Sequence, residues 1–161
     1  MIVLRNDSDL QLLLKKWQRI LKLDAWRIKA RICRIFEMND ANAQGENIWV
    51  LAVRQSDIHI LDSGDFPADS LFEQDMEKTL VHELLHLHFA PFEPEDTDGL
   101  EFCAMEQTVE LLANLLVQME RRENCSIDVG KIAEAICSPF KQVALNPSLV
   151  SDLDIHKDID V

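Results

Sequence analysis

The sequence lacks closely spaced cysteines and long apolar runs. Its four cysteines, Cys33, Cys103, Cys125 and Cys137, form no CxxC pair, so the pattern of a thiolate zinc knuckle is absent and no disulfide framework is indicated. No apolar run approaches the roughly 18 residues of a membrane span, and the start of the chain lacks the pattern of a secretory signal. These absences lead us to expect a soluble, cytoplasmic protein.

Positive charge is also scarce. The chain has 16 lysines and arginines against 29 aspartates and glutamates, which gives a net charge of −13. Binding to a nucleic-acid backbone is driven largely by basic side chains that displace counterions from phosphate. We therefore expect neither a nucleic acid nor an anionic membrane surface as a partner.

The length of 161 residues and the hydrophobic content of 47% predict one globular domain, at residues 1–138, followed by an acidic tail or arm at 139–161. Apolar residues at three- and four-residue spacings predict helices, and alternation predicts short strands. Ser70 and Glu73 have the spacing of a capping box, which would start a helix that ends before Pro91. We expect an α+β fold with helices at 9–21, 70–89, 99–122 and 129–137 and strands at 26–36, 48–53 and 58–61.

The most informative stretch is TLVHELLHLHFAPF, at residues 79–92. On a helix, residues four apart project from the same face, so His82 and His86 can bind one metal ion. Glu83 lies one step round the helix from His82, close enough to act as a general base on a water at that ion. His88 points to roughly the opposite side and is expected to be structural or exposed. Two imidazoles and a carboxylate are costly to bury without a strong partner, which favours a metal over a packing role.

A catalytic zinc usually has three protein ligands and one open position, so a third ligand must come from elsewhere in the chain. If the helix predicted at 99–122 packs antiparallel to the HELLH helix, a residue one to two turns into the helix at 99–122 lies level with His86. Glu106 and Glu110 fit this geometry, one as the ligand and the other as the carboxylate that orients a histidine. The other candidates are Asp96, Asp98, Glu101 and His156.

HELLH followed by Glu106 in MEQTVELLANLLV resembles the gluzincin clan of zinc metallopeptidases. The small size looks most like the minimal minigluzincins and phage or prophage metallopeptidase-like proteins, and the pattern is also similar to the protease part of ImmA/IrrE proteins. The resemblance covers roughly residues 26–122 and implies a zincin-like fold. It also implies Zn²⁺ held by His82, His86 and Glu106, with Glu83 as the general base and Glu110 as the acidic residue that holds the first histidine.

The resemblance further implies a peptide or protein substrate, cleaved by hydrolysis of a peptide bond. In zincin-like folds the substrate lies extended along an edge strand, here predicted at 49–53 or 58–61, with His59 on that edge. The larger enzymes stabilise the oxyanion with a tyrosine or histidine, but this chain has no tyrosine. His88, His156 or a backbone group would have to substitute, or the protein is slow or latent.

Two alternatives stay open. The first is an ImmA/IrrE-like regulatory protease that cleaves one protein target, although the chain leaves no obvious room for a DNA-binding segment. The second is a zinc-stabilised interaction module that has kept the ligands and lost turnover. A latent form of the peptidase is also consistent with the sequence, with the acidic tail around Asp154, His156 and Asp158 lying across the site.

Overall fold

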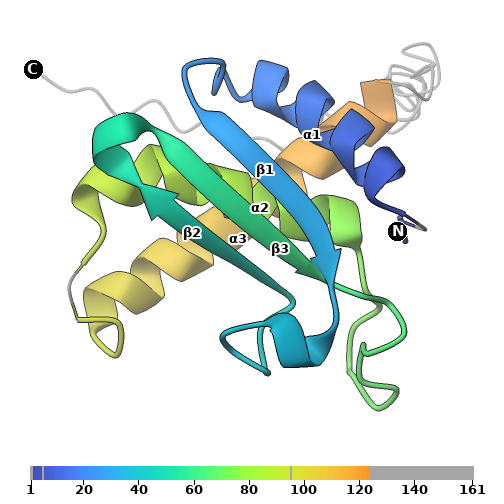
Figure 1. Cartoon of the computed structure of the whole chain (residues 1–161). Coiled ribbons are helices and arrows are strands. Elements are labelled where there is room, and N and C mark those ends of the chain that lie inside the picture. The colour runs from blue at the N-terminus through green and yellow to red at the C-terminus, as the bar shows by residue number, and fades with distance from the viewer. Residues whose placement is uncertain (1, 5, 95, 124–161) are drawn as a thin grey trace, which may run out of the picture. The chain divides into compact units, whose positions relative to one another are not determined.

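A computed structural model describes residues 2–4, 6–94 and 96–123 of the chain (Figure 1). Residues 1–121 form one compact unit, and residues 122–161 are divided from it. The predicted helix at 129–137, the tail at 139–161 and His156 therefore lie outside the described residues. No helix of the described part is long and apolar enough to cross a lipid bilayer.

The predicted α+β class is confirmed for the described residues, which form three helices and a small three-stranded sheet. Short 3-10 turns occur at Ile35–Glu37, Leu51–Val53 and Ala90–Phe92. The helices and strands, in chain order, are α1 at Asp7–Ile20, β1 at Arg27–Cys33, β2 at Gly45–Val50, β3 at Gln55–Leu61, α2 at Met76–Phe89 and α3 at Leu100–Glu123 (Figure 1).

The sheet has the order β1-β3-β2, with β3 parallel to β1 and antiparallel to β2. The free edge of β1 is capped by side chains of α1: Gln11 Nε2 donates to the Ala30 carbonyl at 2.7 Å, and Asp7 Oδ1 accepts from the Ile32 amide at 2.9 Å. Capping of this kind stops an edge strand from pairing with another chain. The edge of β2 has no such cap among the described residues, so it is the open edge of the sheet.

All three predicted strands have the wrong limits. Residues 51–53 turn away from the sheet, and Arg54 takes a left-handed conformation with φ of 51°, so the chain reverses there. Strand β3 then starts at Gln55, earlier than predicted, because its polar first residues pair with strands on both sides. The first strand ends at Cys33, because the Arg34 guanidinium turns to Asp65, with two contacts of 2.6 Å.

The predicted start of the HELLH helix is also wrong. Helix α2 begins at Met76, where the side chain of Asp75 accepts a hydrogen bond from the Lys78 amide at 3.3 Å. Aspartate is among the best helix N-caps because it satisfies an amide that has no partner within the helix. Ser70 instead accepts from the Phe72 amide at 3.3 Å, a local turn that competes with helix formation.

One apolar core joins the sheet to all three helices. In Figure 1 the sheet lies in front of α2 and α3, and α1 lies along the β1 side. The inward residues of the sheet pack in the same cluster as the apolar faces of the helices. The residues of this cluster that are fully buried, at 0% exposure, are Leu10, Trp17, Ile58, Ile60, Met76, Leu80, Val81, Leu84, Val109 and Ala113.

A buried carboxylate ties the three helices together. Glu77, with 1% of its surface exposed, accepts from Trp17 Nε1 at 2.9 Å and from Arg121 Nη2 at 2.8 Å. Arg121 also contacts both carboxylate oxygens of Asp75 at 2.8 Å. The start of α2 is thereby fixed to the end of α3, and this sets the level at which the middle of α3 faces α2.

We expect Arg121→Met to lower the free energy of unfolding by about 2 kcal/mol. Removing one partner of a buried pair leaves a desolvated charge, and the estimate is reduced because the Arg121 side chain is 32% exposed. Urea unfolding of the purified protein measures this difference. The exposed neighbour Arg122 provides the control, since Arg122→Met should change stability by less than about 0.5 kcal/mol. Equal effects of the two substitutions would contradict this role for Arg121.

Candidate metal centre

Helix α2 presents His82 and His86 to α3 from one face. The two residues are four apart, so they lie one above the other on the helix. His82 is half-buried and His86 is 8% exposed, because α2 lies between the sheet and α3. The helix is apolar around them, with Leu80, Val81 and Leu84 fully buried. The imidazoles are therefore held by packing on both sides of the helix.

Glu106 completes a cluster with these two histidines. The Nε2 atoms of His82 and His86 are 3.1 Å apart, and the carboxylate oxygens of Glu106 lie 3.4 Å from the first and 3.3 Å from the second. Zinc binds imidazole nitrogen and carboxylate oxygen at about 2 Å, so tetrahedral ligands lie about 3.3 Å from one another. The separations of these donor atoms match that geometry, and the chemistry of the set suits a zinc ion.

No other group of three potential ligands comes together in the described part of the chain. Three of the alternative third ligands, Asp96, Asp98 and Glu101, are exposed and lie outside the cluster. The antiparallel packing of α3 on α2 brings Glu106 level with both histidines, as the helix geometry predicted.

Glu110, one turn beyond Glu106, contacts the other side of His82. Its Oε2 accepts from His82 Nδ1 at 3.3 Å. With a metal bound, a hydrogen bond at Nδ1 would fix the tautomer in which the Nε2 lone pair faces the cluster. Glu110 thus lies where an orienting carboxylate was predicted.

Glu83 lies beneath the start of β2, with 7% of its surface exposed. An added Cβ at Gly45 would lie 2.7 Å from Glu83 Oε1 and 2.6 Å from the Thr79 methyl, so only glycine allows this close approach of strand and helix. The Asn47 side chain holds the same strand down by donating to the Glu83 carbonyl at 2.7 Å. Strand β2 therefore covers one side of the Glu83 carboxylate.

The charges of the site shift the pKa values of its residues in different directions. Burial is the main cause that raises the pKa of Glu83, to about 7, and the Glu106 charge adds to it. Burial also lowers the pKa of His86, whereas the pKa of His82 is raised because its hydrogen bond to Glu106 and the nearby carboxylates outweigh burial. The hydrogen bond to His82 lowers the pKa of Glu106. The cluster therefore favours an ionised carboxylate at Glu106 and a neutral imidazole at His86.

Two histidines named from the sequence lie away from the cluster. His88 is exposed, and its Nε2 donates to the Leu21 carbonyl at 3.0 Å, in agreement with the expected structural role. The placement of His59 on a substrate edge is wrong. His59 is on the central strand β3, is 5% exposed and contacts Glu46 at 2.6 Å, so both edges of its strand are already paired.

Three residues of β2 at the site were not predicted. Gly45 and Asn47 contact Glu83, and the Trp49 ring stacks on His86 with centroids 6.3 Å apart and an interplanar angle of 16°. The sequence feature that these three residues share is their alternate spacing, because residues 45, 47 and 49 of a strand lie on the same face, here the face toward α2. Without knowledge of the sheet order, nothing in the sequence shows that this strand covers the HELLH helix.

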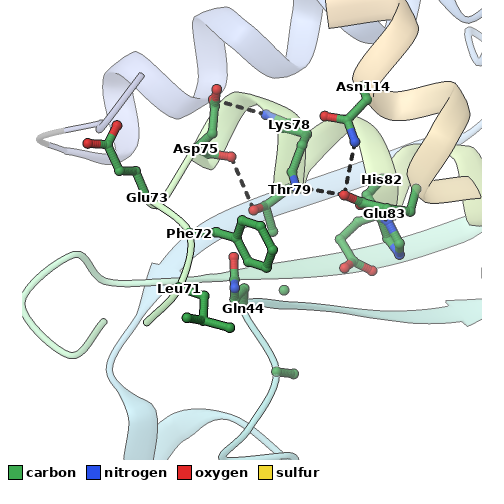
Figure 2. Close-up of a pocket in the computed structure, with 13 residues that line it drawn as sticks. Gln44, Leu71, Phe72, Glu73, Asp75, Lys78, Thr79, His82, Glu83 and Asn114 are labelled. Carbon is green, nitrogen blue, oxygen red and sulfur yellow. Dashed lines mark hydrogen bonds and ion pairs between the residues drawn. The ribbon is translucent and has the colours of Figure 1, made fainter. Parts of the chain in front are cut away.

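A cleft of about 760 Å³ opens beside Glu83 and His82 (Figure 2). Helices α2 and α3 line it from one side through Lys78, Thr79 and Asn114. The loop before α2 lines it through Phe72, which is 77% exposed (Figure 2). Glu83 is itself one of the residues that line the cleft.

Comparison of the chain with protein-family models, with curated proteins and with solved structures gives no match. The resemblance to gluzincins therefore stays a prediction from the motif, and the case for the site rests on its geometry.

The pKa of Glu83 predicts how the stability of the metal-free protein depends on pH. The carboxyl ionises near pH 4.5 when the chain is unfolded but only near pH 7 in the fold, so stability is lost as pH rises between these values, by about 3 kcal/mol. Glu83→Gln cannot ionise and should lack this part of the loss. Urea unfolding at pH 5 and pH 8 measures the difference, and parallel pH dependences of the two proteins would contradict the assigned pKa.

Proposed function

We propose that the protein is a zinc-dependent metallopeptidase with a minimal zincin-like fold. The observation that carries the proposal is the cluster of His82, His86 and Glu106, whose donor atoms have the separations of tetrahedral zinc ligands, with the buried carboxylate of Glu83 beside it. Two histidines, one carboxylate and an open position are typical of catalytic rather than structural zinc.

The proposed reaction is hydrolysis of a peptide bond. Zinc in this position would supply a Lewis acid that makes water more acidic and polarises a carbonyl. Glu83 takes a proton from the water, the water oxygen bonds to the carbonyl carbon, and the carbon–nitrogen bond then breaks as Glu83 returns the proton to the leaving nitrogen. Glu110 keeps His82 in the required tautomer during these steps.

The open edge of β2 supports an extended peptide as the substrate. In its antiparallel ladder with β3, the amide and carbonyl groups of Gly45, Asn47 and Trp49 point away from β3, as the pairing of Gln44 with Leu61 fixes. The same three residues lie on the face of β2 that covers the HELLH helix. A peptide that pairs with this edge as an added strand would run directly past the cluster.

Among the described residues, no side chain takes the place of the oxyanion donor, which supports slow or latent turnover. His88 is not available because it is bonded to the Leu21 carbonyl, and the chain has no tyrosine. Loss of one such donor lowers the rate of a comparable enzyme by roughly a hundredfold or more. The same observation favours the second candidate function, a zinc-stabilised interaction module without turnover.

Three substitutions separate these functions. Glu106→Gln should weaken zinc binding by about a hundredfold or more, because it removes an anionic ligand. Glu83→Gln should keep zinc and abolish cleavage, because it removes only the base. Glu101→Gln, at an exposed glutamate on the same helix as Glu106, is the control and should change neither zinc binding nor cleavage.

The measurements are zinc content by mass spectrometry and cleavage of fluorescent casein by zinc-loaded protein. Cleavage by Glu83→Gln at the wild-type rate would sink the peptidase assignment. Stoichiometric zinc in the wild type with no cleavage of casein would favour the interaction module.

A further inference from the structure

The carboxylate of Glu110 is held by three side chains from two helices. Its Oε1 accepts from Lys78 Nζ at 2.7 Å and from Asn114 Nδ2 at 3.1 Å, and its Oε2 accepts from His82 Nδ1 at 3.3 Å. Figure 2 shows Lys78 and Asn114 directed toward the same point beside His82. The two oxygens of Glu110 thus have different partners. Oε1 contacts Lys78 and Asn114, which lie outside the cluster, and Oε2 contacts His82, which belongs to it.

Helical spacing creates this arrangement. Lys78, His82 and His86 are each four residues apart on α2, and Glu106, Glu110 and Asn114 are each four apart on α3. The two rows run in opposite directions. Lys78 and His82, one helical turn apart on α2, therefore both reach Glu110 on α3. Neither Lys78 nor Asn114 is part of the HExxH pattern or touches the cluster itself.

The lysine and asparagine restrict a carboxylate that would otherwise be free to turn. The Glu110 side chain is 43% exposed, so water competes for both of its oxygens. Lys78 is 30% exposed, and its charge and hydrogen bond lower the pKa of Glu110 despite the opposing effect of burial. With Oε1 fixed by two donors, Oε2 is left with the geometry that suits His82.

We propose that Lys78 and Asn114 are positioning residues for metal binding, which act through Glu110 on the tautomer and orientation of His82. The inference rests on the proposed metal site but not on peptidase activity. Partners that orient a metal-binding histidine typically change metal affinity by 10- to 100-fold. Lys78 and Asn114 are one step more remote, so we expect about tenfold for each.

A double-mutant cycle tests this inference on the full chain. Zinc affinity is measured by competition with a chromophoric chelator for the wild type, Lys78→Met, Glu110→Gln and the double variant. Lys78→Met should weaken zinc binding by about tenfold in the wild type and by less than about twofold in Glu110→Gln, because its effect passes through Glu110. Lys78→Arg keeps the charge and a donor, and should stay within about threefold of the wild type.

Asn114→Leu should give the same dependence on Glu110. Lys15→Met, at an exposed lysine of α1, is the matched control and should leave zinc affinity unchanged. Circular dichroism of each metal-free variant verifies folding, and a misfolded Lys78→Met is replaced in the cycle by Asn114→Leu.

An unchanged zinc affinity in Lys78→Met and Asn114→Leu would overturn the inference, as would an equal loss in the Glu110→Gln background, which would indicate a general structural role. Zinc binding by the wild type without casein cleavage would favour the interaction module over the peptidase and leave this cycle fully measurable. A wild type that binds no zinc overturns both.

Discussion

The site depends on the antiparallel packing of α3 against α2. The buried Glu77 joins the start of α2 to Arg121 near the end of α3, and from there the two helices approach one another with opposite direction. Because both helices are regular, this anchor fixes which residues of α2 and α3 face one another farther along the two helices. A shift of α3 by one helical turn would place Glu110 where Glu106 now faces His86, and no carboxylate would remain to contact His82 Nδ1.

The sheet sets the second limit on the site, from the opposite side of α2. Gly45 permits β2 to approach the helix closely, Asn47 bonds to its backbone and Trp49 stacks on His86. These contacts exclude water from one side of Glu83 and leave the cleft as its access. The two edges of the sheet differ among the described residues, because α1 caps β1 and leaves the edge of β2 open. The edge proposed for peptide binding is therefore on the strand that covers the proposed metal site.

Much of the site could be predicted from the sequence because its spacing is local. His82, Glu83 and His86 follow from one helix, and Glu106 and Glu110 from a short connection to a second helix that packs antiparallel. Residues whose role depends on the sheet order could not be found in this way. The sequence alone places His59 on an edge strand because it does not show which strands are neighbours, whereas β3 is the central strand.

The same difference explains the other departures. Arg121, a residue far along the chain, contacts both carboxylate oxygens of Asp75, the N-cap of α2. The local spacing of Ser70 and Glu73 contains no information about that contact. Lys78 and Asn114 are ordinary polar residues of two amphipathic helices, and their importance appears only when both helices face the same carboxylate.

The central claim is that His82, His86 and Glu106 hold one zinc ion through nitrogen and oxygen atoms. X-ray absorption at the zinc edge of the zinc-loaded protein tests it most directly. The account predicts nitrogen and oxygen neighbours at about 2.0 to 2.1 Å, with the outer scattering pattern of two imidazoles and no sulfur. A sulfur neighbour at about 2.3 Å, or a shell without imidazole scattering, would contradict it.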